Sequence, residues 1–397
     1  MTAVRQWARI ALVRLGFVLG RIRPVRRRIV LATSHDPVPR GNLAALRRAL
    51  AAQRPQVPVV IQAFAVGRGL GAQWRAVRES IRAGYLLSSS AVFVVDDFFL
   101  PIYVVPPRAG TTIIQVWHAC GAFKRFGYST RDKTFGADES TLGRLRIHAN
   151  YDVCLVSSTS VAPAYADAFD QPLDRFRSDL GIPRTDAVIP GLGTPALVAE
   201  LRRRYAIPEG KRVILYAPTF RGTSITAARA DGLPDWYALR DALVDDHVLL
   251  VRLHPFVRSA LTIDRELDGF VTDVSDHRDI NELLHVTDVL VTDYSSVIYE
   301  FALLGRPMVF FAPDLDAYEA ERGFFFDYRT GVPGPVAETT DALADALRTL
   351  DVAAAAAQAD AFARASFDVA DGHATERVVE QLLIPALDRP LRPREDA

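Results

Sequence analysis

The turn at residues 292–296 carries the residue types that bind a phosphate. An apolar run at 289–291 predicts a buried strand, and Asp293, Ser295 and Ser296 lead from it into an apolar face at helical spacing. A strand that passes through a polar turn into a helix places hydroxyls and unbonded backbone N–H groups at a helix N-terminus, where both favour a phosphate or diphosphate. The alternative is an ordinary helix cap, since Ser and Asp cap helices in every kind of protein.

A second strand end carries a candidate general base. The apolar run at 112–116 leads to Trp117 and His118, and a turn that contains glycine, Lys124 and Arg125 follows. The ordinary pKa of histidine, about 6.5, suits the removal of a proton from a hydroxyl near neutral pH. The alternative is a structural histidine buried beside Trp117.

Two further strand ends add donors and cations. Thr219 and Arg221 follow an apolar run at 213–216, and Arg252 and His254 end the run that begins at residue 248. Four such turns at equivalent positions of a fold predict a polyphosphate ligand in a cleft. Glu300 lies one turn into the helix after the serines, where it either accepts hydrogen bonds from a ribose or pairs with a local arginine.

The elements that must position these turns alternate between short apolar runs and helical patterns. Strands are predicted in two series, at 29–33, 59–64, 92–95, 112–116 and 153–156, and then at 213–216, 248–252, 270–272, 289–291 and 308–311. Helices are predicted near 43–52 and 72–83. The alternation indicates two doubly wound α/β domains that face a cleft, because ligands bind beyond the carboxyl ends of parallel strands.

The domain boundaries follow from composition. We assign 1–28 to a basic amphipathic segment at a membrane surface, 29–190 to an N-terminal α/β domain and 191–383 to a C-terminal α/β domain, with a linker at 190–195. Residues 384–397 contain three prolines and are predicted to be disordered.

Composition excludes several classes of protein. The 397 residues contain 47 basic and 47 acidic side chains, so the formal net charge of zero argues against a nucleic-acid partner. Neither a Gly-x-Gly-x-x-Gly fingerprint nor a phosphate-loop motif occurs, which disfavours dehydrogenases and NTPases, and no zinc motif occurs. Cys120 and Cys154 form no metal or disulfide pattern, which indicates a reducing compartment.

The N-terminal segment is unevenly charged. Residues 1–28 contain eight arginines and no acidic residue, with apolar residues between them. The longest uncharged run, 15–20, is far shorter than the roughly 20 residues that cross a bilayer, and Arg14 interrupts any signal-peptide core. We expect a basic amphipathic helix on an anionic inner membrane surface. The alternative is a surface helix docked on the protein.

Several motifs together carry a resemblance to a known family. In consistent order between residues 92 and 328, the chain contains Trp-His-Ala-Cys-Gly-Ala-Phe-Lys-Arg-Phe-Gly at 117–127, Gly-Ile-Pro-Arg-Thr-Asp at 181–186, Tyr-Ala-Pro-Thr-Phe-Arg at 216–221, Arg-Leu-His-Pro at 252–255, Thr-Asp-Tyr-Ser-Ser-Val-Ile-Tyr-Glu-Phe-Ala at 292–302, Phe-Phe-Ala-Pro-Asp-Leu-Asp-Ala-Tyr at 310–318 and Arg-Gly-Phe-Phe-Phe-Asp-Tyr at 322–328. Together they resemble the CDP-glycerol glycerophosphotransferases of teichoic acid synthesis, and chain length is more similar to the glycerol-phosphate primases than to the polymerases. Cys120 departs from the pattern, which has a smaller residue at that position.

The resemblance implies a GT-B-like pair of Rossmann-type domains and a peripheral enzyme on the cytoplasmic face of the cell membrane. It implies CDP-glycerol as the donor and an undecaprenyl-diphosphate-linked saccharide as the acceptor. CDP-ribitol or another CDP-polyol cannot be distinguished from CDP-glycerol by sequence. No cofactor is implied; a divalent metal is possible, and Asp293 could contribute to its binding.

The predicted reaction is attack of an acceptor hydroxyl on the phosphorus nearest the glycerol, with CMP as the leaving group. His118 and His254 are the predicted catalytic residues, with His118 as the base. The donor site is assigned to Thr219, Arg221, Arg252, Asp293, Ser295, Ser296 and Glu300, and the acceptor side to Trp117, Lys124 and Arg125. Two alternatives stay open, a GT-B glycosyltransferase that uses a nucleotide sugar and a catalytically inactive membrane scaffold.

Overall fold

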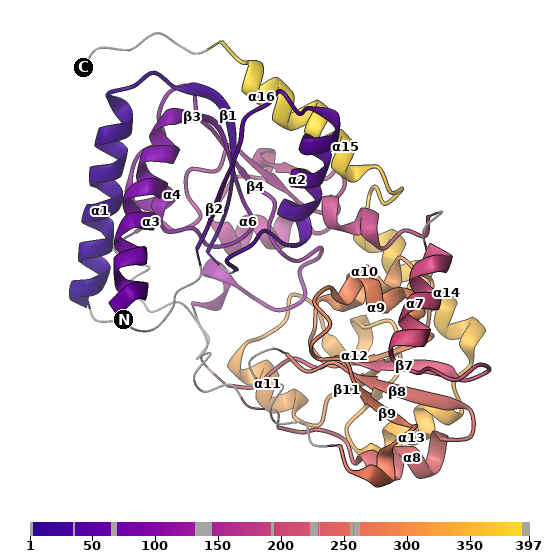
Figure 1. The fold of residues 1–397 in the computed structure, drawn as a ribbon. Helices are drawn as coiled ribbons and strands as arrows, with labels where there is room; N and C mark the ends of the chain where they lie inside the picture. The colour runs from indigo at the N-terminus through magenta and orange to yellow at the C-terminus, as the bar shows by residue number, and fades with distance from the viewer. Residues whose placement is uncertain are drawn as a thin grey trace.

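Two parallel β-sheets of six strands each form the frame of the molecule (Figure 1). The structure, a computed structural model, describes residues 3–34, 36–64, 70–131, 145–191, 194–222, 229, 231–254, 257 and 263–390. The first sheet has the order β2 (Val59–Ala63), β1 (Arg26–Thr33), β3 (Ser90–Val95), β4 (Thr112–Gln115), β5 (Val153–Leu155) and β6 (Phe176–Arg177). The second has the order β12 (Val336–Ala337), β11 (Met308–Phe311), β10 (Val289–Thr292), β7 (Arg212–Tyr216), β8 (His247–Val251) and β9 (Val271–Asp273).

The apolar runs form strands because helices cover both faces of each sheet. β3, β4, β10 and β11 are buried at every residue, as central strands of a doubly wound sheet must be. All ten predicted strands are confirmed within one to three residues at each end. β6 and β12 escaped prediction because each is two residues long and contains no apolar run.

The helices of the N-terminal domain include both that were predicted, α2 (Gly41–Gln53) and α3 (Leu70–Ser89). They are accompanied by α1 (Ala3–Arg21), α4 (Pro101–Val104) and α6 (Ala162–Phe169). The C-terminal domain contains α7 (Thr194–Arg204), α8 (Trp236–Leu243), α9 (Ile280–Val286), α10 (Val297–Ala302), α11 (Leu315–Glu321), α12 (Tyr328–Gly331), α13 (Thr340–Arg348) and α14 (Val352–Ser366).

Helix α1 is docked along α3, as Figure 1 shows at the left of the molecule. Ile10, Val13 and Phe17 of α1 are buried in the core of the N-terminal domain. The two backbones approach so closely that a Cβ atom at Gly84 would lie 2.0 Å from the Val13 carbonyl oxygen, so this position requires glycine. One face of α1 is therefore docked on the protein, as the alternative expected, and its other face is exposed.

The last two helices return to the N-terminal domain. α15 (Ala374–Val378) packs on α2, and α16 (Ile384–Asp388) packs on β1 and β3, as the yellow helices of Figure 1 show. The prediction that 384–397 is disordered is wrong for Ile384–Asp388, because Ala386 and Leu387 are buried in the core. Residues 391–397, and residues 192–193 of the predicted linker, lie outside the described part of the chain.

Candidate active site

Each sheet has one point at which the strand order reverses, and the candidate residues gather around these two points. In the first sheet the reversal lies between β1 and β3, and in the second it lies between β7 and β10. Connections leave such a pair of strands in opposite directions, which opens a crevice at their carboxyl ends. The turns after β7 and β10 lie at such a point of the second sheet, whereas His118 follows β4 and Arg252 follows β8, each one strand away from it.

A pocket of about 520 Å³ opens between the two domains. The N-terminal domain contributes Thr33, Asn42, Asp96, Asp97, Trp117 and His118 to its lining, and the loop that follows the domain contributes Arg184. The C-terminal domain contributes Arg252, Arg278, Asp279 and Asn281. Its size suits a small polar ligand, and arginines and carboxylates face each other across it.

His118 lies on the wall of this pocket with half of its side chain exposed. Its Nδ1 is 3.2 Å from the carbonyl oxygen of Asp96 and 3.6 Å from a carboxylate oxygen of Asp97. Trp117 is buried and stacks on the imidazole with 4.5 Å between ring centroids. Because the Asp96 carbonyl can only accept, the proton lies on Nδ1, and Nε2 is the basic nitrogen of this tautomer.

The end of β8 contributes one residue to the pocket. Arg252 lines it, with Nη2 donating to the His277 carbonyl at 3.4 Å. Burial lowers the pKa of Arg252, and the carboxylate of Asp279 opposes that effect. His254 lies two residues further, where its ring centroid is 4.8 Å from that of Phe220, and it is not among the described residues that line the pocket.

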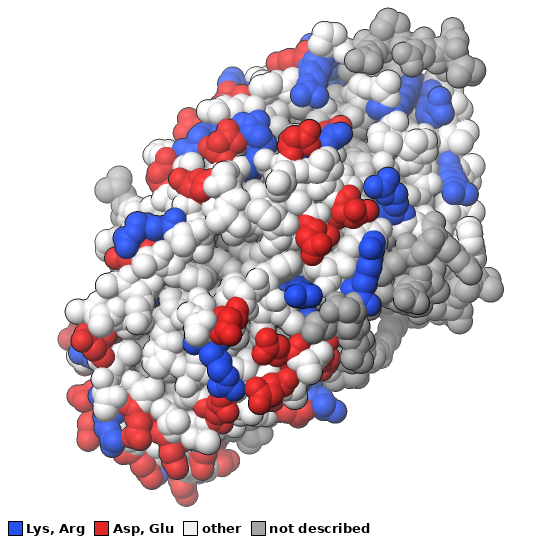
Figure 2. Space-filling view, turned by 180° about the vertical axis from the view of Figure 1, so that it is seen from behind, with Lys and Arg blue, Asp and Glu red and all other residues white. Residues whose placement is uncertain are grey.

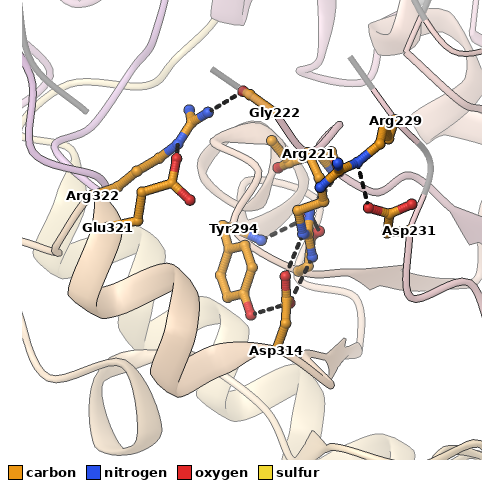
Figure 3. Close-up of polar contacts among 10 residues, drawn as sticks. Arg221, Gly222, Arg229, Asp231, Tyr294, Asp314, Glu321 and Arg322 are labelled. Atoms are coloured by element: carbon orange, nitrogen blue, oxygen red, sulfur yellow. Dashed lines mark hydrogen bonds and ion pairs between the residues drawn. The ribbon is translucent and has the colours of Figure 1, made fainter. Parts of the chain in front are cut away.

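Arg221 forms a bridge inside the C-terminal domain (Figure 3). One nitrogen of its guanidinium donates to Asp293 at 2.8 Å, and two others donate to Asp314 at 2.6 and 2.9 Å. The Tyr294 hydroxyl donates to the same Asp314 carboxylate at 2.9 Å. These ion pairs raise the pKa of Arg221 far above its ordinary value, although burial alone would lower it.

Asp293 holds two strand ends together. Its carboxylate accepts the backbone N–H groups of Thr219 at 2.8 Å and Tyr294 at 2.5 Å, and the Arg221 guanidinium besides. With a side chain 2% exposed, Asp293 ties the turn after β7 to the turn after β10. The structure thus places Thr219, Arg221 and Asp293 together as predicted, but in an internal network in which arginine and aspartate neutralise one another.

Ser295 and Ser296 form the turn that enters α10. The Ser295 hydroxyl accepts a long hydrogen bond from the Val297 N–H at 3.4 Å, and Ser296 is the N-cap residue without a side-chain cap. Among the described residues, no acceptor meets the backbone N–H of either serine. Within the described part of the chain, the turn thus presents two backbone N–H groups that no protein acceptor meets.

Glu300 has the arginine partner that the sequence left as an alternative. Its carboxylate lies 3.0 Å from Nε of Arg184, and its side chain is 3% exposed. Cys120 is buried against the same carboxylate, and burial followed by the charge of Glu300 raises the pKa of its thiol. The ion pair uses Oε1 of Glu300, and the predicted ribose contact stays a prediction.

The segment that carries Lys124 and Arg125 crosses from one domain to the other. Residues 123–125 pair in antiparallel fashion with residues 323–325, and the N–H of Arg125 donates to the Gly323 carbonyl at 3.1 Å. Phe123 stacks against the C-terminal domain in the same contact, 5.3 Å from the ring of Phe326.

The pairing places Lys124, which the sequence assigned to the acceptor side, against the C-terminal domain. The charged groups that act on its ammonium are Arg322, Asp293 and Arg221, all of the C-terminal domain. Burial, with repulsion from the two arginines, lowers the pKa of Lys124 to about 8, against the opposing attraction of Asp293. A backbone pairing between distant segments thus brings Lys124 close to charged groups of the C-terminal domain.

Several residues of the site were missed. Asp96 and Asp97 come directly after the buried β3, which is the same signal that identified His118. Arg184 lies in the motif at 181–186, but only the fold shows that it reaches the pocket. Among the described residues, no three His, Cys, Asp or Glu side chains form a group that could hold a metal ion.

Comparison with known proteins agrees with this geometry. Residues 17–384 match the family described as CDP-glycerol:poly(glycerophosphate) glycerophosphotransferase. The teichoic acid ribitol-phosphate primase of Bacillus spizizenii is 39% identical over 75% of this chain and 75% of its own length. The teichoic acid glycerol-phosphate primase of the same organism is 33% identical over 68% of both chains.

The chain spans only 50 to 59% of the ribitol-phosphate polymerases that it also matches. Among solved structures, the wall teichoic acid polymerase TagF superposes with a TM-score of 0.77 over 98% of this chain and 96% of that chain. Its sequence identity is 23%, so this likeness shows the α/β fold of two domains and no more.

Proposed function

Because the chain belongs to the CDP-glycerol:poly(glycerophosphate) glycerophosphotransferase family, we propose that it moves a polyol phosphate from a CDP-polyol to a hydroxyl of a lipid-linked saccharide or polymer. Membership makes the chain an enzyme, a transferase of teichoic acid synthesis by family. In the proposed reaction the acceptor oxygen bonds to the phosphorus nearest the polyol, the bond from that phosphorus to the bridging oxygen breaks, and CMP leaves. The acceptor proton passes to the enzyme.

The placement of His118 carries the proposal. Its imidazole faces a pocket shared by both domains, and the Asp96 carbonyl at Nδ1 directs the basic Nε2 toward an acceptor hydroxyl. Asp97, 3.6 Å from Nδ1, would stabilise the imidazolium that forms when the proton is taken up. A base with an orienting carboxylate needs no covalent intermediate for phosphoryl transfer.

The donor diphosphate would be held by cations and N–H groups from the C-terminal domain. Arg252 lines the pocket beside His118, and Ser295 and Ser296 present unbonded N–H groups after β10. Lys124 lies near that turn through its approach to Asp293 and carries a positive charge below about pH 8. These groups would stabilise the negative charge that develops on the departing CMP.

The exposed face of α1 would bind the membrane. Trp7, Val18 and Ile22 at its end are 52, 60 and 68% exposed, and Trp74 on the neighbouring α3 is 76% exposed. Apolar side chains among arginines suit the boundary between headgroups and acyl chains of an anionic bilayer. Among the described helices, none is long and apolar enough to cross a membrane.

The distribution of charge between the domains supports this orientation. Residues 1–190 contain 26 basic and 13 acidic side chains, whereas residues 191–397 contain 21 basic and 34 acidic ones. Figure 2 shows the acidic side chains crowded at the lower left, at the end formed by the C-terminal domain. An anionic membrane surface would attract the N-terminal domain and repel the acidic end of the C-terminal domain. The N-terminal domain would then lie on the cytoplasmic leaflet, with the pocket between the domains next to the membrane.

Ribitol is the polyol that the relatives favour. Identity to the ribitol-phosphate primase is 39%, compared with 33% for the glycerol-phosphate primase. We therefore expect CDP-ribitol to be at least as good a donor as CDP-glycerol.

The test measures which nucleotide is released. Purified protein is incubated with a short-chain prenyl-diphosphate-linked disaccharide and with CDP-ribitol, CDP-glycerol or UDP-glucose in turn. CMP formed from a CDP-polyol, lost in His118→Ala and kept in His373→Ala, supports the proposal, because His373 is an exposed surface histidine. Release of UDP from UDP-glucose alone would identify a glycosyltransferase instead.

A further inference from the structure

The backbone immediately before the candidate base is strained. Trp117 has a φ of 47°, in the left-handed region that aromatic residues rarely occupy. Such a conformation costs about 1–3 kcal/mol and persists only where the surrounding structure enforces it. The groups that enforce it at Trp117 also decide where His118 points.

Asn42 binds the backbone carbonyl groups of Trp117 and of the residue before it. Its side-chain amide, 2% exposed as a residue, donates to the Val116 carbonyl at 2.8 Å and to the Trp117 carbonyl at 2.9 Å. Its own oxygen accepts the backbone N–H of Arg184 at 2.8 Å. Both donors and one acceptor site of a single buried amide are thus used, which leaves the loop little freedom.

Arg184 extends these contacts to the His118 carbonyl and to the C-terminal domain. Its guanidinium donates to the His118 carbonyl and lies 3.0 Å from the carboxylate of Glu300 in α10. Asp186 anchors the same short turn, Pro183–Ala187, by accepting the backbone N–H groups of Ala374 and Thr375 at 3.0 and 2.7 Å. The carbonyl of the base is therefore tied to the helix that follows the Ser295–Ser296 turn.

We propose that Asn42 and Arg184 are positioning residues that lock the strained Trp117–His118 backbone and hold the base in register with the donor turn. This inference rests on the proposed function of His118 as the base. Neither residue takes part in the chemical step; each acts through the backbone of residues 116–118. A displacement of the base by about 1 Å can cost about 100-fold in rate, so loss of the lock should lower turnover severely.

Both residues also line the pocket, so a direct contact with the substrate has to be separated from positioning. A residue that binds the donor raises the Kd for CDP when it is replaced, whereas a positioning residue lowers kcat and leaves donor affinity unchanged. The test uses Asn42→Asp, which keeps the side-chain shape but turns an oxygen toward two carbonyl oxygens. Arg184→Lys is the milder second variant, since it keeps the charge and loses the fork of donors.

Arg177→Ala is the matched control, because this half-exposed arginine of β6 pairs with Asp179, two residues further along the chain, and does not line the pocket among the described residues. Kinetics of CMP release, calorimetric CDP binding and the imidazole NMR signal of His118, assigned by its loss in His118→Ala, are measured for each protein. We expect kcat to fall about 10- to 100-fold in Asn42→Asp and less in Arg184→Lys, with the Kd for CDP within twofold and the His118 signal shifted.

An equal loss in CDP affinity, or an unmoved His118 signal in Asn42→Asp, would overturn the inference. The two hypotheses can fail separately. If wild-type protein releases no CMP from any CDP-polyol, the proposed reaction is wrong, while the position of the His118 signal in Asn42→Asp still decides whether the lock exists.

Discussion

Replacement of Lys124 by methionine should stabilise the protein at neutral pH and lose that effect in alkali. The ammonium lies within the electrostatic influence of Arg322, Asp293 and Arg221, and its pKa falls from 10.5 to about 8 because of burial and the two arginines. The difference between 10.5 and about 8, at about 1.4 kcal/mol for each pKa unit, corresponds to about 3 kcal/mol of unfavourable free energy in the folded state.

The sign of the pH dependence follows from proton binding. Below about pH 8 the lysine is protonated in the folded and the unfolded chain, so the folded state bears the full cost of the buried charge. Between about pH 8 and 10.5 the unfolded chain holds the proton that the folded chain has released, so the stability of the wild type rises with pH relative to Lys124→Met. The extra stability of Lys124→Met over the wild type should therefore decrease between about pH 8 and 10.5.

Urea unfolding between pH 7 and 10 measures this difference. Lys124→Met should exceed the wild type by up to about 3 kcal/mol at pH 7 and approach it at pH 10. Lys124→Arg is the matched control, because its charge persists over the whole range and its difference from Lys124→Met should not change with pH. A constant gap between wild type and Lys124→Met would refute the placement of this lysine among the cations of the C-terminal domain.

Three other experiments test the site and the membrane surface. His118→Ala should lower CMP release by about 10²–10⁴-fold while calorimetric CDP binding survives, and turnover within a few-fold of wild type would exclude it as the base. Ser295→Ala combined with Ser296→Ala should leave CDP binding within a few-fold if the backbone N–H groups are the donors, whereas a loss of tenfold or more would assign binding to the hydroxyls. Val18→Glu should weaken sedimentation with vesicles rich in phosphatidylglycerol, and Val352→Glu, on an exposed helix of the C-terminal domain, should not.

The fold was predictable because its strands are short apolar runs buried on both faces. Residues 289–291 illustrate this: three consecutive apolar residues cannot form the half-exposed strand of an antiparallel sheet, and the structure buries all of β10. The prediction of a disordered C-terminal tail was based on its prolines. Pro385 lies just after a π-helical turn, Val379–Leu383, and the helical backbone continues through the proline into α16.

The strand ends were predictable as polar turns, but the partners of each charge were not. Arg221 and Glu300 were assigned to the ligand from their position after a strand, and the structure pairs them with Asp314 and Arg184. Sequence position says that a charged side chain reaches a strand end; it does not say whether a countercharge from elsewhere in the chain arrives there too. A buried charge needs such a partner, so charged residues at a buried strand end are more often neutralised by the protein than left for a ligand.

Lys124 is a second case in which the sequence does not reveal the charged neighbours of a residue. Its segment reaches the C-terminal domain through a pairing between residues almost 200 positions apart, which no local pattern reveals. The pairing brings a third cation to Arg221 and Arg322, and Asp293 is the carboxylate that acts on it there. Burial and the repulsion of the two arginines lower the pKa of Lys124, and a diphosphate bound beside its ammonium would raise that pKa again. CDP should therefore bind with proton uptake above about pH 8 in the wild type but not in Lys124→Met, which calorimetry in buffers of different ionisation enthalpy would detect.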